Sequence, residues 1–175
     1  MKYQDSFDFE GRGHIRCVQQ LGMVKLWERL KGAAELPRLS AVEGCELERL
    51  RDKLLMTDVV WRDGEPSYVI RFQGADFSKM HNRDCTGLSL NDIMAPAVRE
   101  QGLRTYRAVV DLRIPAFTST VVRDAGGASV QYERLLLPFT STGQGVEHIH
   151  CVITLFAEDN CSPFAVMRES RAKSA

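Results

Sequence analysis

Residues 54–73 constrain the fold more than any other stretch, because they hold two strand patterns joined by a tight-turn signal. Residues 54–61 (LLMTDVVW) form an apolar run rich in β-branched side chains. Farther on, Tyr68, Ile70 and Phe72 alternate with their neighbours at the two-residue period of a strand. The Asp-Gly pair of RDGEP lies between them, and Asp-Gly favours the short turn of an antiparallel hairpin. The segment therefore predicts two paired antiparallel strands.

A helical pattern precedes this hairpin at residues 18–31 and ends at Gly32. Apolar side chains recur on more than one side of this helix, so it is apolar over much of its girth. We expect one side to cover another part of the chain and the other side to meet a second subunit. The candidates for that dimer contact are Leu21, Val24, Trp27 and Leu30.

A second helix is predicted at residues 96–111, where Pro96 suits the first turn and Val98, Gly102 and Tyr106 share a face. Three strand patterns follow at about residues 114–123, 129–139 and 146–156. This order predicts an α+β domain over residues 17–157, an antiparallel sheet with helices on one face. We expect residues 1–16 to form a loose arm and residues 158–175 a polar tail.

The stretch VEHIHC, residues 146–151, raises the question of a metal site. On a strand, His148 and His150 point to one side, while Ile149 and Cys151 point to the other, towards the core. A zinc site needs further ligands, and His14 and His81 lie in loops that the sequence does not place. We therefore predict no metal. The alternative is a small enzyme or metal-binding protein that uses the two histidines with an acidic residue, Asp84 or Glu133.

Composition narrows the classes of partner. Lys plus Arg (23) equals Asp plus Glu (23), so no net charge favours nucleic acid. No apolar run approaches the roughly 20 residues of a membrane helix, and we expect a cytoplasmic protein. The five cysteines are scattered and never spaced C-x-x-C, which favours free thiols. A redox role for Cys85 or Cys161 stays open. No Ser-His-Asp pattern, phosphate-binding glycine loop or H-E-x-x-H motif is found, so we expect no enzyme.

The polar stretch NRDCTGLSLND, residues 82–92, has two interpretations. In the structural one, Asp84 or Thr86 caps a turn, Gly87 takes a positive φ, and Leu88 and Leu90 fill the core. In the functional one, the stretch is a loop that gates a ligand cavity. The turn chemistry favours the structural interpretation.

Four motifs together resemble the short, single-domain bacterial PAS proteins over about residues 23–157. The matching residues are Trp27, Leu30, Gly32 and Pro37, then Tyr68, Arg71 and Gly74, then Arg83, Asp84, Thr86, Gly87 and Leu90, and finally YERLLLP at 132–138. The resemblance implies a five-stranded antiparallel PAS-like sheet with helices on one face and an additional N-terminal helix. It also implies a sensory or regulatory homodimer that binds a small apolar or amphipathic ligand, a signalling protein partner, or both.

The resemblance further implies a cavity between sheet and helices. Combined with strand and helix periodicity, it gives these lining candidates: Met56, Val59, Tyr68, Ile70, Phe72, Phe77, Met80, Leu90, Tyr106, Val109, Ile149 and Cys151. The ligand is unknown. Haem is disfavoured because residues 96–111 contain no histidine, and flavin is disfavoured because Cys85 lacks the motif of a photosensor cysteine.

Overall fold

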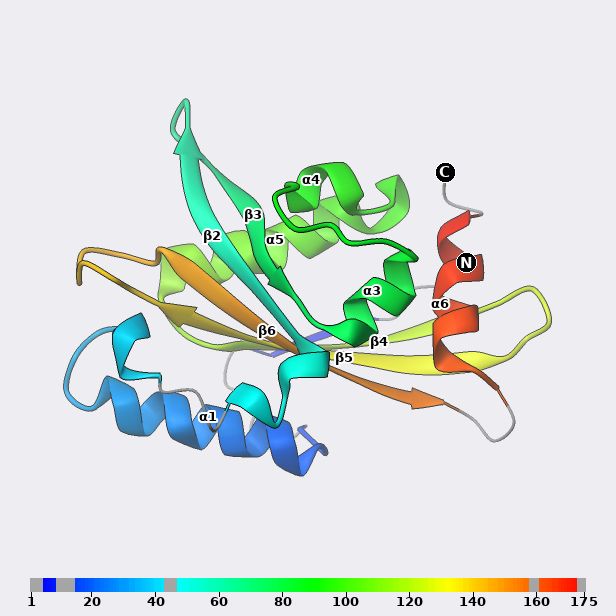
Figure 1. Cartoon of the computed structure of the whole chain (residues 1–175), viewed down its shortest axis with the longest axis horizontal. Coiled ribbons are helices and arrows are strands. Elements are labelled where there is room, and N and C mark those ends of the chain that lie inside the picture. Colours follow the sequence, from blue (N-terminus) through cyan, green and yellow to red (C-terminus); the bar gives the residue numbers. More distant parts are fainter. Residues whose placement is uncertain (1–4, 9–14, 43–46, 158–160, 173–175) are drawn as a thin grey trace.

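One antiparallel sheet of six strands, in the order β1-β4-β5-β6-β2-β3, forms the centre of the molecule (Figure 1). The computed structural model describes residues 5–8, 15–42, 47–157 and 161–172. The strands are β1 (Asp5–Asp8), β2 (Leu54–Arg62), β3 (Glu65–Gln73), β4 (Ala116–Arg123), β5 (Ser129–Phe139) and β6 (His148–Ala157). The helices are α1 (Val18–Lys31), α3 (Ala75–His81), α4 (Leu90–Ile93), α5 (Pro96–Leu112) and α6 (Pro163–Ala172), with short 3₁₀ turns at Leu39–Ala41 and Arg51–Lys53.

The β2–β3 hairpin forms as predicted. Arg62 pairs with Glu65, and both turn residues, Asp63 and Gly64, have positive φ angles of 52° and 82°. Two positive φ values define the turn that matches the natural twist of paired strands, which explains the Asp-Gly sequence. Strands β2 to β6 are the five strands expected from the sequence.

The two chain ends differ from the prediction. Residues Asp5–Asp8 are strand β1, which pairs antiparallel with β4, so residues 1–16 are not simply a loose arm. Residues Pro163–Ala172 are helix α6, and its Val166 and Met167 are buried, so the description of 158–175 as a polar tail is wrong. Both short elements are stabilised by contacts with β4, which is distant in sequence, and local periodicity does not reveal such contacts.

Helices lie on both faces of the sheet (Figure 1). Helices α3, α4, α5 and α6 lie on one face, and α1 lies on the other. Two buried hydrogen bonds hold α1 to the sheet: Gln20 Nε2 donates to the Val152 carbonyl at 3.0 Å, and Trp27 Nε1 donates to the Pro138 carbonyl at 2.7 Å. Of the described helices, none is long and apolar enough to cross a membrane.

The loop before α4 follows the structural interpretation in part. Asp84 Oδ1 accepts from the backbone N–H of Thr86 at 2.9 Å and from its hydroxyl at 2.7 Å. Gly87 has φ 85°, and Leu90 is buried. Leu88 does not fill the core, because its side chain is 38% exposed. Its backbone instead joins the edge of β3, where the Leu88 carbonyl accepts from the Ile70 N–H at 2.9 Å.

Candidate functional site

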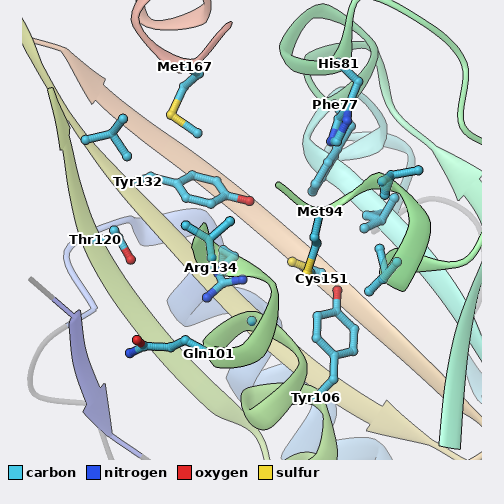
Figure 2. Close-up of a pocket in the computed structure, with 16 residues that line it drawn as sticks. Phe77, His81, Met94, Gln101, Tyr106, Thr120, Tyr132, Arg134, Cys151 and Met167 are labelled. Atoms are coloured by element: carbon cyan, nitrogen blue, oxygen red, sulfur yellow. The ribbon is translucent and has the colours of Figure 1, made fainter. Parts of the chain in front are cut away.

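A cavity of about 110 Å³ lies between the sheet and the helices α3 to α6 (Figure 2). This volume is many times the ~10–15 Å³ that one water molecule needs. Residues of the strands line one side of the cavity, and residues of the helices line the other side. The lining residues are Leu55, Phe77, His81, Leu90, Ile93, Met94, Val98, Gln101, Gly102, Tyr106, Thr120, Val122, Tyr132, Arg134, Cys151 and Met167.

Four of the residues expected in the cavity line it: Phe77, Leu90, Tyr106 and Cys151. The other candidates lie elsewhere. Most of them are core residues: Tyr68, Ile70, Met80, Val109 and Ile149 are each 2% exposed or less, and Val59 is half-buried. The Tyr68 ring packs against the Tyr106 ring with centroids 4.9 Å apart, so this aromatic pair fills the space beside the cavity.

Met56 and Phe72 lie outside the cavity because of strand geometry. The two residues are register partners, and the register shifts between Met56 and Thr57. Successive side chains of a strand point to opposite faces, so Leu55 lines the cavity and its neighbour Met56 does not. The irregularity in the pairing is not visible in the sequence.

The cavity residues missed by sequence reasoning come mainly from β4, β5, α5 and α6. Their signal was partly present: Tyr132 and Arg134 alternate in YERLLLP, and Val98 and Gly102 lie on the helix face shared with Tyr106. Met167 could not have been found, because α6 was not predicted.

Arg134 supplies the positive charge of the cavity. Its Nε donates to Thr118 Oγ1 on the neighbouring strand β4 at 3.0 Å, and its guanidinium carbon lies 5.6 Å from the centroid of the Tyr132 ring. Within the described part of the chain, no carboxylate forms an ion pair with Arg134. Among the described residues, the groups that contact the Arg134 guanidinium are therefore neutral.

The thiol and phenol beside this charge are neutral. Burial raises the pKa of the Cys151 thiol to about 11 and holds the pKa of the Tyr106 phenol well above its usual range. The two side chains are hydrogen-bonded to each other. This part of the cavity wall therefore offers no negative charge to Arg134.

Gly102 of α5 lets the helix approach Met94 closely. A Cβ at Gly102 would lie 2.9 Å from Met94 Sδ and 3.1 Å from Met94 Cε. Glycine in a helix interior costs about 1 kcal/mol relative to alanine, and here the missing side chain leaves room for a flexible methionine. Figure 2 shows the Met94 side chain close to Tyr106 and Cys151 in the cavity.

The two histidines of β6 lie on the opposite face of the sheet from Cys151. His150 is buried against Phe139, with ring centroids 4.6 Å apart, and neither of its ring nitrogens has a hydrogen-bond partner among the described residues. Burial, followed by the charges of Arg71 and His148, lowers the pKa of His150 to about 3. Across the described ranges, no three His, Cys, Asp or Glu side chains are grouped to hold a metal; His14 lies outside these ranges.

His148 takes part in a Ser-His-Asp arrangement, which the sequence motifs did not reveal. His148 Nδ1 lies 2.8 Å from Asp58 Oδ1, and His148 Nε2 lies 2.7 Å from Ser141 Oγ. The expectation that no such arrangement occurs is wrong, because its members come from three separate segments. Asp84 and Glu133, the acidic residues of the sequence-based enzyme hypothesis, do not belong to it.

The backbone donors beside Ser141 are already used. Glu147 accepts from the N–H groups of Ser141 and Thr142 at 2.7 and 2.8 Å and from the Thr140 hydroxyl at 2.9 Å. These bonds, the Thr142 N–H first, lower the pKa of Glu147 to about 2. A serine hydrolase needs free donors for the oxyanion of its tetrahedral intermediate. Here the donors nearest Ser141 hold a carboxylate instead.

The four residues of α1 that were predicted to contact a second subunit differ in burial. Val24 and Trp27 are buried in this chain, while Leu21 and Leu30 are half-buried. The buried pair is therefore not exposed to a second subunit. Leu21 and Leu30 stay candidates.

The cysteines are free thiols in the described segments, and Cys45 lies outside them. Cys85 is buried with 0% exposure, which removes the exposed position that a redox sensor needs. Cys161 is half-buried.

Comparison with known proteins gives one family and several similar folds. A family model described as a PAS domain matches residues 17–153. No curated protein sequence matches the chain.

Three solved structures illustrate the similar folds. One is a light-oxygen-voltage domain studied with a flavin analogue (11% identity, 65% of this chain and 83% of that chain, TM-score 0.46). Another is the light-state blue-light photoreceptor Aureochrome1 LOV (10% identity, 74% and 96%, TM-score 0.45). A third is an RNA-binding light-oxygen-voltage receptor (10% identity, TM-score 0.46), where the match covers 98% of this chain and 42% of that one.

These structures correct the expectation on cofactors. Light-oxygen-voltage domains occur among the similar structures, one of them studied with a flavin analogue, so the expectation that flavin is disfavoured is contradicted. The RNA binding of the third structure is a property of that protein. The expectation that nucleic acid is not a partner of this chain stays a prediction.

Proposed function

This chain belongs to the PAS domain family, and from that premise we propose that it is a non-enzymatic sensory or regulatory domain that binds a small amphipathic molecule. The observation that supports this function is the cavity of about 110 Å³ between the sheet and the helices. Its walls are mostly apolar, and a few polar groups, Arg134 among them, converge on it. Ligand sites in proteins have this composition.

A route from the cavity to α1 supports a signalling role. Cys151 lines the cavity, and the carbonyl of the next residue, Val152, accepts a hydrogen bond from Gln20 of α1. Arg134 also lines the cavity, and its neighbour Glu133 accepts from Arg16, just before α1, at 3.2 Å. Because strand neighbours face opposite sides, a ligand that shifts β5 or β6 would move the groups that hold α1.

The output partner in this proposal is a second copy of the chain or a signalling protein. Helix α1 carries Val18, which is 80% exposed, while Leu21 and Leu30 are half-buried and pack partly against the core. An apolar side chain left in water at this level is a candidate contact with a partner surface.

The test is native mass spectrometry of the protein as purified, alongside a cavity-filling variant. Val98→Trp places a large ring in the cavity, and Val18→Trp adds the same side chain at an exposed position of α1 as a matched control. We expect one reproducible small-molecule mass on the wild-type protein and on Val18→Trp, and its loss from Val98→Trp. Wild-type protein without any adduct, or the same adduct on all three proteins, would contradict binding in the cavity.

The alternative function is a hydrolase that uses Ser141, because this hydroxyl is hydrogen-bonded to His148 and His148 to Asp58. A fluorophosphonate probe reacts with serines activated in this way. We expect no labelling, since Glu147 occupies the adjacent backbone donors. Labelling of Ser141 that disappears in Asp58→Asn would support the alternative and contradict a non-enzymatic domain.

A further inference from the structure

We propose that the ligand of this cavity is an organic monocarboxylate with an apolar body, whose carboxylate binds Arg134. The inference rests on the proposed function, since it names the chemical class of the molecule in the same cavity. It follows from the charge, the donor geometry and the apolar wall of the site.

The charge of Arg134 requires a partner. None of the lining residues is an aspartate or a glutamate. Among the described residues, the guanidinium contacts the Thr118 hydroxyl at 3.0 Å and the face of the Tyr132 ring at 5.6 Å, and both groups are neutral. Arg134 is half-buried, and a charge partly withdrawn from water is stabilised by a counter-charge, which an anionic ligand would supply. A neutral ligand would leave the guanidinium without a counter-charge.

The free donors of Arg134 suit a carboxylate. Thr118 takes the Nε donor, and no hydrogen bond joins the terminal nitrogens Nη1 and Nη2 to another residue that the structure describes, so they can bind a ligand. A guanidinium binds the two oxygens of a carboxylate through two parallel hydrogen bonds. Gly102 of α5 lies beside this end of the cavity, because a Cβ there would be 3.8 Å from Arg134 Nη1.

The rest of the cavity limits the ligand to one negative charge. Burial keeps the Tyr106 phenol and the Cys151 thiol neutral, so neither side chain places a negative charge beside Arg134. A phosphate dianion is best bound by more than one permanent cation, and Arg134 is the only lysine or arginine among the lining residues, with His81 as the one further basic side chain. A single carboxylate matches a single guanidinium.

Apolar groups line the opposite part of the cavity. Helices α3 to α5 contribute Phe77, Leu90, Ile93, Met94 and Val98. In Figure 2, Phe77 lies on the side of the cavity across from Arg134 and Tyr132. Met94 lies nearer to Arg134, because a Cβ at Gly102 would be 2.9 Å from Met94 Sδ and 3.8 Å from Arg134 Nη1. An acid with a short aliphatic chain or one aromatic ring would place its apolar part here and its carboxylate at Arg134.

The experiment uses methyl NMR of the full chain labelled at methionine. Met94 and Met167 line the cavity, and Met23 of α1, which does not line it, gives the comparison at a distance. The probes are two pairs of equal shape, hexanoate with hexan-1-ol and phenylacetate with 2-phenylethanol. Each is titrated into wild type, Arg134→Gln, Arg134→Lys and the matched control Arg123→Gln, which removes the same charge from an exposed strand end.

We expect both acids to shift Met94 and Met167, which line the cavity, more strongly than Met23. Each acid should bind wild type and Arg123→Gln roughly ten- to a hundredfold more tightly than its alcohol, as charge-assisted hydrogen bonds give. In Arg134→Gln the ratio of acid to alcohol affinity should be close to one. Arg134→Lys keeps the positive charge and should keep part of this ratio. The lysine variant also tests the inference if Arg134→Gln does not fold. Equal binding of acids and alcohols by wild type, or a preference that survives in Arg134→Gln, would overturn the carboxylate inference and leave cavity binding intact. If no probe shifts Met94 or Met167, both the inference and the proposed cavity function are contradicted.

Discussion

His150 should make the stability of this protein depend on pH. The ring is buried against Phe139 and its nitrogens lack hydrogen-bond partners among the described residues, so only the neutral form is compatible with the fold. The pKa of His150 is about 3 in the folded protein, against 6.5 for an ordinary histidine. Between these values the unfolded chain binds a proton that the folded chain does not. Stability is therefore unaffected above pH 6.5 and decreases as the pH falls from 6.5 towards 3.

The size of the effect follows from the two pKa values. At pH 5 the linkage relation gives a loss of about 2 kcal/mol for this one group, and at pH 7.5 it gives roughly zero. Replacement by leucine removes the titration. It also removes two buried polar nitrogens that have no hydrogen-bond partner among the described residues, and this should stabilise the folded protein by about 1 kcal/mol at neutral pH.

Urea unfolding at pH 7.5 and pH 5 measures this difference for wild type and His150→Leu. With a slope of about 2 kcal/mol per molar urea, the midpoint of wild type should fall about 1 M more than that of the variant. Titrating groups that do not interact with His150 act equally in both proteins and cancel in the comparison; His148, whose charge acts on His150, is the exception. A parallel decrease in the two proteins would refute the reasoning. So would an imidazole resonance of His150 that titrates near pH 6 in the folded state.

Two further substitutions test the packing of α1 and α3. Trp27→Phe removes the hydrogen bond to the Pro138 carbonyl and should cost about 1–2 kcal/mol in urea unfolding, whereas the exposed Trp61 (53%) should tolerate the same change within about 0.5 kcal/mol. Equal costs at the two sites would contradict the buried bond. Gly74→Ala should destabilise by about 2 kcal/mol or more, because its Cβ would lie 2.2 Å from the Arg51 carbonyl oxygen. Gly22→Ala, with open space around it, should stabilise by roughly 0.5–1 kcal/mol; a neutral Gly74→Ala would show that the contact relaxes.

The parts of the fold that the sequence predicted have short-range causes. The Asp-Gly turn sets the β2–β3 hairpin, and the apolar stripe of residues 96–111 corresponds to α5. The face of β6 that carries His150 was also predicted, because alternation alone determines it. In contrast, β1 and α6 are short, and their stability comes from contacts with distant strands.

The candidate site was less predictable because it combines many segments. Phe72 leaves the alternation of Tyr68 and Ile70 at an irregularity in the pairing of β2 with β3, which leaves no sequence signal. Asp58 and His148 are 90 positions apart, and only pairing of β2 with β6 brings them together. The strand pattern at residues 129–139 includes Arg134. Its proposed role in ligand binding depends on the lack of Asp and Glu among the lining residues, which one sequence does not show.

The short strand β1 has a consequence for the behaviour of this protein at high concentration. An unpaired edge strand offers a row of N–H and C=O groups that a second molecule can extend into a continuous sheet. Here β1 covers the outer edge of β4, and the backbone of Gly87 and Leu88 covers part of β3 through two hydrogen bonds with Ile70. A chain that lacks residues 1–8 would keep its cavity but expose β4 along its length. Its first defect would be intermolecular aggregation rather than loss of ligand.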